Sequence, residues 1–413
     1  MKTIPQHTIR LQDGSLCNFS KRIAKQAKPL IQFLLKIPDP REEQGKRHSL
    51  VLILLIIFIA FLRGSKDLKD AHLFAIHTRK LFQKYVFMPH GIPDPTTISR
   101  VLQELEAEHV IRAFVCFLKT LDIPLGSVFS FDGKTMRAVS GKEAVRHMLS
   151  FFSHGTHVTL GQIGVSSKEN EIPAFGRLLS QISGGMKVEG LLFLGDALHT
   201  QKETVKAILG KKADYLFVVK GNQKDLFEAI NIAFSEEEAM GNIYQAKNKP
   251  SFIKDSFTYS ENRRKRSVTT TATLTHDKQL ITYLKQTHGW EGIQTVGVLR
   301  RTGKRVSKDG KATDVNETIG FISSRVLTAK QAALHLKGHW CIENNLHWTK
   351  DVVFLEDKQT VRLGNAPQVM SFLRSMCISI FNICKFKSIS DAIHNLEKSP
   401  TLHSQFLRMA AIV

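Results

Sequence analysis

The feature that most constrains the fold is an alternation of short apolar runs with helical segments between residues 126 and 234. The runs predicted as strands are 128–131, 148–152, 158–165, 191–194 and 214–219. The segments predicted as helices are 172–182, 201–209 and about 224–234. A turn at residues 153–156 suits a hairpin between the second and third strands. Three strands followed by alternating helices and strands are typical of an α/β layout.

Residues 1–122 are predicted to be helical. Apolar residues in 30–37 and 50–62 are too dense for one-sided helices, so both helices are expected to be buried. The run 50–62 is shorter than the roughly 20 residues that cross a bilayer. It therefore predicts a buried helix, and no membrane partner is expected.

A capped helix is predicted after Pro93-Asp94-Pro95, because Ile98, Val101 and Leu102 follow with helical spacing. A short helix after a turn is compatible with a DNA-reading helix-turn-helix, and equally with packing in a helical bundle. We expect domain 1–122 to bind DNA ends, with bundle packing as the alternative.

The second half of the chain changes character twice. Residues 241–324 are rich in Thr, Lys and Arg, and strand signals at 268–274, 295–301 and 318–322 predict a β-rich insertion. Helices are predicted from 328 to about 350 and from 366 to 384. The predicted domains are 1–122, 123–240 (first part of the core), 241–324, 325–385 (end of the core) and a tail, 386–413.

Charge narrows the class of partner. The 58 Lys and Arg residues exceed the 37 Asp and Glu residues, which gives a formal net charge of +21. Such an excess favours a polyanionic partner, either nucleic acid or an anionic membrane surface. The five cysteines form no C-x-x-C pair, and the first residues lack an apolar signal segment. A reducing, cytoplasmic location is therefore expected, and a zinc ribbon is not.

Two aspartates follow two of the predicted strands. Asp132 comes directly after Phe131, and Asp196 follows Gly195. A lone aspartate at such a position usually caps a turn or helix. Two carboxylates brought together repel each other, which protonation of one of them or a divalent cation relieves.

The helix predicted from residue 328 supplies a third carboxylate. Trp340, Glu343, His347 and Lys350 are spaced by three, four and three residues, so an α-helix would place them on one face. That face is either solvated or laid across the sheet, and the second arrangement would bring Glu343 to Asp132 and Asp196.

Several segments resemble one family of proteins. They are I-P-D-P-R (37–41), G-I-P-D-P-T-T-I-S-R (91–100), F-D-G-K-T (131–135), S-K-E-N-E-I-P-A (167–174), G-D-A-L-H-T-Q (195–201), A-D-Y-L-F-V-V-K-G-N-Q (213–223), G-H-W-C-I-E-N-N-L-H-W (338–348) and F-L-E-D (354–357). Together they resemble bacterial insertion-sequence transposases of the H-repeat-associated (ISAs-type) family, which have an RNase H-like DDE core. The resemblance implies a mixed-sheet RNase H-like catalytic core, a helical N-terminal domain and a β-rich insertion before the last catalytic helix.

The resemblance also implies an activity. Asp132, Asp196 and Glu343 would be the catalytic triad and would hold two Mg²⁺ or Mn²⁺ ions, with Asp132 bridging both. The substrate would be double-stranded DNA, namely the terminal inverted repeats of the element and the target, and the synaptic complex would contain a homodimer. A nuclease on the same core and a DNA-binding remnant without activity are the alternatives.

Cations and polar residues around the triad are candidates for DNA contact. The candidates are Lys134, Lys220, Gln223, Arg263, Arg264, Lys265, Arg266, Lys337, His347 and Lys350. The family usually has Arg where Lys337 stands. Each lysine and the basic run could equally be a solvated surface, and residues 220–223 could simply form a turn in which Asn222 caps a helix.

His339, Glu343 and His347 stand four residues apart and could be taken for a zinc site. Steps of four residues drift by about 40° on an α-helix, and three carboxylates prefer Mg²⁺ or Mn²⁺ to zinc. We therefore expect the two histidines to position Glu343 or to contact DNA. Trp290, Trp340 and Trp348 could stack on a base, although core packing is the commoner use of tryptophan.

Overall fold

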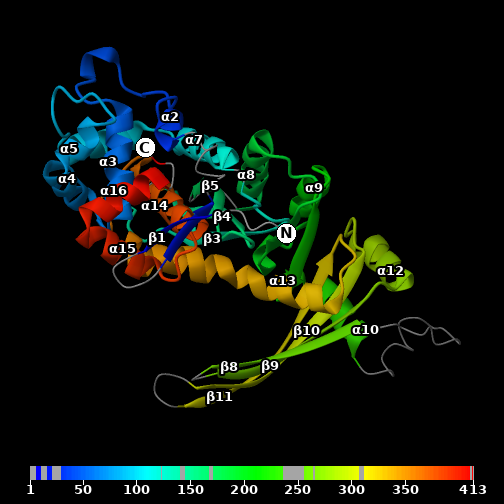
Figure 1. Cartoon of the computed structure of the whole chain (residues 1–413). Coiled ribbons are helices and arrows are strands. Elements are labelled where there is room, and N and C mark those ends of the chain that lie inside the picture. The colour runs from blue at the N-terminus through cyan, green and yellow to red at the C-terminus, as the bar shows by residue number, and fades with distance from the viewer. Residues whose placement is uncertain are drawn as a thin grey trace, which may run out of the picture. The chain divides into compact units, whose positions relative to one another are not determined.

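The structure is a computed structural model of the chain (Figure 1). It describes residues 6–10, 16–20, 29–121, 123–139, 145–166, 171–235, 255–263, 266–306, 311–409 and 412. The chain divides into two compact units. The first unit comprises Met1–Gly126, Gly133–Met186 and Cys341–Val413, and the second comprises Ser127–Asp132 and Lys187–Trp340.

The first unit begins with an antiparallel pair of strands, β1 (Gln6–Arg10) and β2 (Leu16–Ser20), so the prediction that this region is helical is wrong for these residues. Helices follow, as predicted. They are α2 (Leu30–Leu34), α3 (Leu50–Leu62), α4 (Leu68–His77), α5 (Arg79–Gln83), α6 (Pro95–Glu104) and α7 (Ala107–Thr120).

Helix α3 lies in the core of the first unit. Every one of its residues is buried, and the Ser49 hydroxyl caps its start by accepting the backbone N–H of Leu52. No helix in the described ranges is both long and apolar enough to span a bilayer. The prediction of a buried helix is confirmed.

Helix α6 starts as its sequence predicts. The Asp94 carboxylate accepts the backbone N–H of Thr96 at 2.8 Å, and Pro95 is the first helical residue. The apolar side chains of Ile98, Val101 and Leu102 are buried.

Strand β3 (Val128–Thr135) is shared by the two units, which divide it after Asp132. In the first unit, β4 (Val145–Ser153) and β5 (Thr159–Ser166) pair antiparallel and form the predicted hairpin. Helix α8 (Glu171–Gly185) packs against both strands.

The core of the second unit contains β6 (Leu192–Gly195) and β7 (Asp214–Val219). Strand β6 runs parallel to both β3 and β7, and β7 pairs antiparallel with β11 (Ala312–Ser323). Helices α9 (Lys202–Leu209) and α10 (Lys224–Phe234) follow β6 and β7, as predicted.

The insertion is β-rich, as predicted. It contains β8 (Asp255–Arg263), β9 (Arg266–Thr275), α12 (Lys278–His288), β10 (Thr295–Val306) and β11. The strand order in the second unit is β3-β6-β7-β11-β10-β9-β8, and β8 to β11 form the long ribbons labelled in Figure 1.

Helix α13 (Ala329–Cys341) packs Ala332, Ala333 and Leu336 against the sheet of the second unit. The chain then continues in π-helical turns at Ile342–His347 (η4) and Thr349–Val353 (η5). An uninterrupted α-helix was predicted here, so the spacing used for its side chains was wrong.

The first unit closes with α14 (Ala366–Ile383), which is buried along nearly its whole length and packs against α3, α6 and α7. The predicted tail contains two further helices, α15 (Ile389–Lys398) and α16 (Pro400–Met409), which contact each other. Short 3₁₀ turns lie at Glu43–Gly45 (η1), Ala197–His199 (η2), Gly221–Gln223 (η3) and Glu356–Lys358 (η6). The fold class is confirmed: a mixed α/β chain with a helical N-terminal region and a β-rich insertion before the last core helices.

Candidate active site

Asp132 lies within β3 and Asp196 directly follows β6, which is the parallel neighbour of β3. The parallel register pairs Val128 with Leu192 and continues to Ser130 with Leu194. Two residues further along each strand come Asp132 and Asp196, both partly exposed. Because neighbouring strands are about 4.8 Å apart, both carboxylates emerge at the same edge of the sheet. The backbone register therefore places these two predicted residues at neighbouring positions.

Close packing fixes the strand end before Asp196. A Cβ atom on Gly195 would lie 2.6 Å from Cζ of Phe131 and 3.1 Å from Cβ of His199. The rings of Phe131 and His199 meet edge to face with centroids 4.8 Å apart. Only glycine leaves room for this contact, which explains the G-D pair in the sequence.

Asp196 also caps the loop that follows it. Its Oδ1 accepts the backbone N–H of His199 at 3.3 Å, so the capping role expected for a lone strand-end aspartate is present as well. Gln223 donates from Nε2 to the carbonyl of Thr200 at 2.9 Å, and the Asn222 amide donates to the carbonyl of Ala197. Asn222 does not cap α10, whose N-cap is Gln223. Residues 220–223 thus tie the loop after β7 to the loop after β6.

His339 anchors α13 beside the two aspartates. Its Nδ1 shares a hydrogen bond of 2.8 Å with the Ser130 hydroxyl on β3, and its ring is buried. Burial lowers the pKa of His339 to about 4, although nearby Asp196 acts in the opposite direction. The imidazole is therefore neutral at physiological pH and adds no positive charge next to Asp196.

A second set of polar contacts, centred on Glu317, lies in the second unit. Glu317 on β11 accepts Lys220 Nζ at 3.3 Å and Arg301 NH1 at 3.2 Å. The Arg301 guanidinium lies 4.6 Å from the ring centroid of Trp340 on α13. Lys220 keeps about half of its side chain exposed and is available to a further anion.

Lys337 on α13 is already engaged. Its Nζ lies 2.8 Å from Oε1 of Glu261 and 4.7 Å from the ring centroid of Tyr259. Part of the side chain remains exposed, so a DNA contact at Lys337 would compete with Glu261.

Glu343 belongs to the first unit and has an exposed side chain within η4. His347, at the end of η4, is partly exposed. Lys350, predicted to share their face, is fully buried. The predicted face is wrong because π-helical turns hold more residues than α-helical turns.

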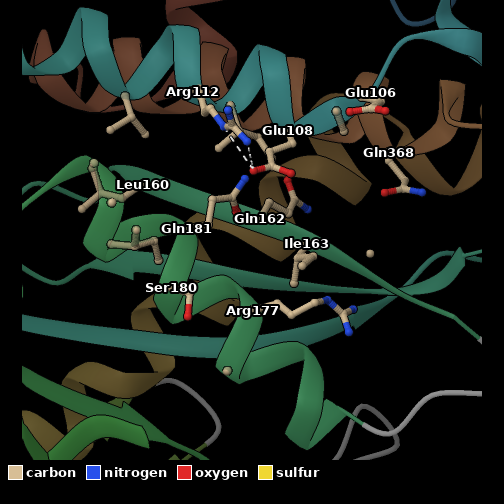
Figure 2. Close-up of a pocket in the computed structure, with 18 of the residues that line it drawn as sticks. Glu106, Glu108, Arg112, Leu160, Gln162, Ile163, Arg177, Ser180, Gln181 and Gln368 are labelled. Atoms are coloured by element: carbon tan, nitrogen blue, oxygen red, sulfur yellow. Dashed lines mark hydrogen bonds and ion pairs between the residues drawn. The ribbon is translucent and has the colours of Figure 1, made fainter. Parts of the chain in front are cut away.

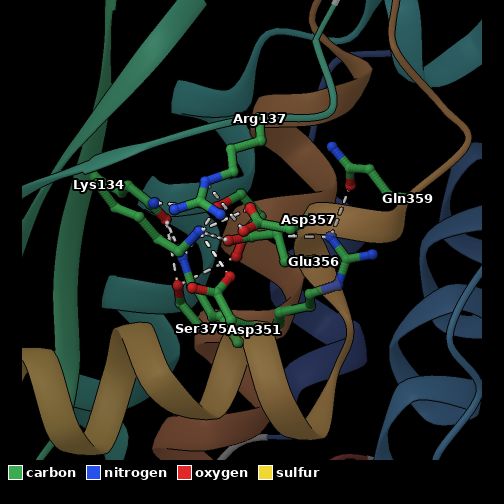
Figure 3. Close-up of polar contacts among 11 residues, drawn as sticks. Lys134, Arg137, Asp351, Glu356, Asp357, Gln359 and Ser375 are labelled. Carbon is green, nitrogen blue, oxygen red and sulfur yellow. Dashed lines mark hydrogen bonds and ion pairs between the residues drawn. The ribbon is translucent and has the colours of Figure 1, made fainter.

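A buried ion network occupies the first unit beyond β3 (Figure 3). Lys134 Nζ lies 2.8 Å from Asp351, 3.4 Å from Glu356 and 3.4 Å from Asp357. Burial alone would lower the pKa of Lys134, but Glu356 and Asp351 raise it above its ordinary value. Lys134 is held by three carboxylates and has little exposed surface, so its predicted phosphate contact is not available in this structure.

The deeper part of the network surrounds Glu356. Arg374 NH1 lies 3.7 Å from Glu356 and donates to Gln359 Oε1 at 2.8 Å. Burial would raise the pKa of Glu356, yet Lys350, Arg374 and Lys134 lower it to about 2. The carboxylate is therefore ionised in the core.

Lys350 is the second predicted DNA contact that the structure places inside. Its Nζ donates to the Ser371 hydroxyl at 2.9 Å and to Gln162 Oε1 at 3.5 Å. Burial lowers its pKa to about 8. With no exposed surface, Lys350 cannot reach a phosphate, and we reassign it to the core.

The structure describes the basic run 263–266 only in part. In the backbone register, Arg263 at the end of β8 is paired with Arg266 at the start of β9. Arg264 and Lys265 lie outside the described residues. Phosphate contact by the four residues stays a prediction.

A cavity of about 1160 Å³ lies elsewhere in the first unit (Figure 2). It is lined by α7, β5 and α8, and includes the exposed ion pair of Arg112 with Glu108. None of the residues that line it is a predicted site residue, and its lining mixes both signs of charge.

The chemistry of the aspartate pair fits a divalent metal ion. Two carboxylates on adjacent strand ends offer hard oxygen ligands, which Mg²⁺ and Mn²⁺ prefer. Within the described ranges, no three His, Cys, Asp or Glu side chains are gathered closely enough to hold a metal. The structure thus supplies Asp132 and Asp196 as two candidate metal ligands. A third metal ligand is considered under the proposed function.

The sequence missed several residues of these networks. Ser130, Arg301, Glu317 and Arg374 gave no local signal, because each acquires its partner from a distant part of the chain. The F-L-E-D segment did mark Glu356 and Asp357, without indicating that they meet Lys134.

Comparisons with known proteins give the class of protein to which this fold and site belong. The family model described as "Transposase DDE domain" matches residues 123–380, and "DDE_Tnp_1-associated" matches residues 31–118. The chain belongs to this family of bacterial DDE transposases.

Two relatives from Escherichia coli are similar over most of their length. "Putative transposase YncI" of strain O157:H7 is 28% identical over 92% of this chain and 93% of its own. "H repeat-associated putative transposase YhhI" of strain K12 is 30% identical over 86% of this chain and 90% of its own. A piggyBac transposase synaptic complex with hairpin DNA aligns with a TM-score of 0.39 and 13% identity, over 94% of this chain and 79% of that one. That likeness is too low to inform function.

Proposed function

We propose that this transposase binds the ends of its insertion sequence, cleaves them by metal-dependent phosphodiester hydrolysis and joins them to target DNA by transesterification. The observation that carries the proposal is the register that sets Asp132 beside Asp196, in a chain of the DDE transposase family. Paired carboxylates at the carboxyl edge of a sheet are suited to metal-assisted phosphoryl chemistry.

Asp132, Asp196 and Glu343 are the proposed ligands of two Mg²⁺ or Mn²⁺ ions. Divalent ions held in this way favour the ionised form of the attacking water or 3′-hydroxyl and offset the charge on the leaving oxygen. Glu343 lies four residues beyond His339 along the chain, and its exposed carboxylate is free to act as a ligand.

His339, near the end of α13, is proposed to position the π-helical turn η4 that follows it and contains Glu343. As a neutral imidazole bonded to Ser130, it fixes α13 on β3 and does not compete with a cation for Asp196. Zinc is not proposed. His339 is buried and its Nδ1 is engaged by Ser130, so it is not an open zinc ligand that could act with His347.

DNA contact is assigned to the remaining candidates. Lys220, Gln223, Lys337, His347 and the basic run 263–266 are proposed to meet phosphates or bases, and Lys134 and Lys350 are not. Domain 1–122 is proposed to bind the element ends, and a homodimer to assemble the two ends on the bacterial nucleoid in the cytoplasm. The net charge of +21 supports a polyanionic partner.

The test is cleavage of a labelled element end in Mg²⁺ or Mn²⁺. Asp132→Asn, Asp196→Asn and Glu343→Gln are each expected to abolish cleavage, while filter binding stays within about threefold, because each change removes a ligand charge but no cation. Asp225→Asn, an exposed carboxylate on α10, is the matched control and should cleave normally.

The outcomes separate the alternatives. Near-native cleavage by one variant would remove that residue from the triad. Cleavage without joining to target DNA would favour a nuclease, and binding without cleavage by the wild type would favour a DNA-binding remnant.

A further inference from the structure

The three tryptophans lie in different surroundings. Trp290 is buried, and Trp340 lies under the Arg301 guanidinium. Trp348 in the first unit is 56% exposed, and Val352 nearby is 51% exposed. Both side chains are apolar and open to solvent, so they are available for contact with another molecule.

The π-helical turns place Trp348 on the same face as Glu343. The positions 343, 348 and 352 are separated by five and four residues and are all exposed. Positions 342, 346 and 350 are separated by four residues and are all buried. These intervals suit a helix whose hydrogen bonds run from residue i to i+5. The exposed face thus carries a carboxylate and an aromatic ring.

No lysine from this helix reaches that face. Lys350 points inward, where Ser371 holds its ammonium group at 2.9 Å. The face therefore offers a stacking surface and not a phosphate contact.

We propose that Trp348 stacks on an unpaired nucleobase of the DNA strand that Glu343 serves, an inference that rests on the proposed function. An indole ring stacks on any base, because every base presents a π-face. The area offered by one exposed tryptophan and one valine is far smaller than the roughly 800 Å² that each partner buries in a stable protein interface. It is comparable to the face of a single base. The surplus of positive charge on the chain supports a nucleic-acid partner over a second copy.

The experiment compares two DNA probes in metal-free buffer, so that no cleavage occurs. One is a forked duplex with 2-aminopurine in the unpaired arm at the junction, and the other is a blunt duplex of equal length. We expect the wild type to quench the 2-aminopurine fluorescence and to prefer the forked probe. In Trp348→Ala, the quenching should vanish and the preference should fall about 5- to 150-fold, the range expected for one stacked base.

Three further variants make the result specific. Trp348→Tyr should keep part of the preference, because its ring still stacks, and Trp348→Leu, which keeps apolar bulk without a ring, should behave like Ala. Tyr283→Ala is the matched control, because Tyr283 on α12 is also an exposed aromatic residue, at 36% exposure, that is assigned no DNA contact, and the change should leave both signals unchanged. Thermal melting of each variant checks that it is folded.

Each remaining outcome counts against the inference. Equal binding of both probes by the wild type, or quenching retained in Trp348→Ala and Trp348→Leu, overturns it. If Trp348→Ala changes the oligomeric state and neither DNA signal, the face binds a second copy of the chain, and the inference is overturned. Failure of the proposed function shows separately, as absence of metal-dependent cleavage by the wild type whatever the fluorescence does.

Discussion

The buried carboxylate of Glu356 should contribute strongly to stability. It is 2% exposed and lies 3.4 Å from Lys134 Nζ and 3.7 Å from Arg374 NH1. Its pKa of about 2 is below the ordinary 4.5, so the folded state favours the ionised form. Each pKa unit corresponds to about 1.4 kcal/mol, which gives about 3 kcal/mol near neutral pH. Removing one member of a buried ion pair usually costs about 3–5 kcal/mol, in agreement.

The perturbation is Glu356→Gln, which keeps the shape and removes the charge. For a domain of about 150–250 residues, 1 kcal/mol corresponds to about 2–4 °C in Tm, so we expect a loss of roughly 6–12 °C by calorimetry at pH 7. Because folding lowers this pKa, the contribution is present above pH 4.5 and is lost as the pH falls toward 2. The gap between wild type and variant should therefore narrow in acid.

Asp357→Asn is the matched control. Asp357 lies at the same 3.4 Å from Lys134 Nζ but keeps 25% of its side chain exposed, so its loss should cost at most about 1 kcal/mol. Equal melting of wild type, Glu356→Gln and Asp357→Asn at pH 7 would refute the reasoning, because the attraction would then only offset desolvation.

Two further predictions concern cations. Burial lowers the pKa of Lys350 to about 8, so wild-type stability should rise relative to Lys350→Met as the pH increases from 8 to 10.5, and parallel pH profiles in urea denaturation would contradict this. Replacing Arg263, Arg264, Lys265 and Arg266 together with Ala should flatten the log–log salt dependence of DNA binding by roughly 2–4 units if two to four phosphates are contacted, and an unchanged slope would leave the run as solvated surface.

Elements governed by local chemistry could be predicted from the sequence. The apolar run of α3, the Asp94 cap of α6 and the strands β6 and β7 each carry their signal within a few residues. The adjacency of Asp132 and Asp196 also followed, because parallel strands end at a common edge.

Two elements of the insertion, α12 and β8, were not predicted from the sequence. Asp277 caps the start of helix α12 by accepting the backbone N–H of Leu280 at 2.8 Å, and Gly289, with φ of 66°, follows its last residue. Strand β8 lies in a segment with few apolar residues, and its Ser and Thr side chains bond to those of β9, as Thr258 does with Thr271 at 3.0 Å. Strand pairing of this kind is not visible in one strand alone.

The surroundings of Lys350 could not be predicted from local spacing. Its partners come from β5 and α14, through Gln162 and Ser371, and its position depends on the π-helical turns after Cys341. An α-helical spacing of 3.6 residues puts Lys350 beside Glu343, whereas the longer π turns carry it to the opposite face.

This relocation also changes how the net charge of the chain relates to DNA binding. The buried cations Lys134, Lys350 and Arg374 are grouped with the buried Glu356 and the partly exposed Asp351 and Asp357, so three cations are balanced by three carboxylates. The network adds nothing to the excess of +21, which must therefore come from the rest of the chain. Counterion release depends on cations that meet phosphates. The salt dependence of binding should thus be insensitive to this network and should report on other candidates, among them the half-exposed Lys220.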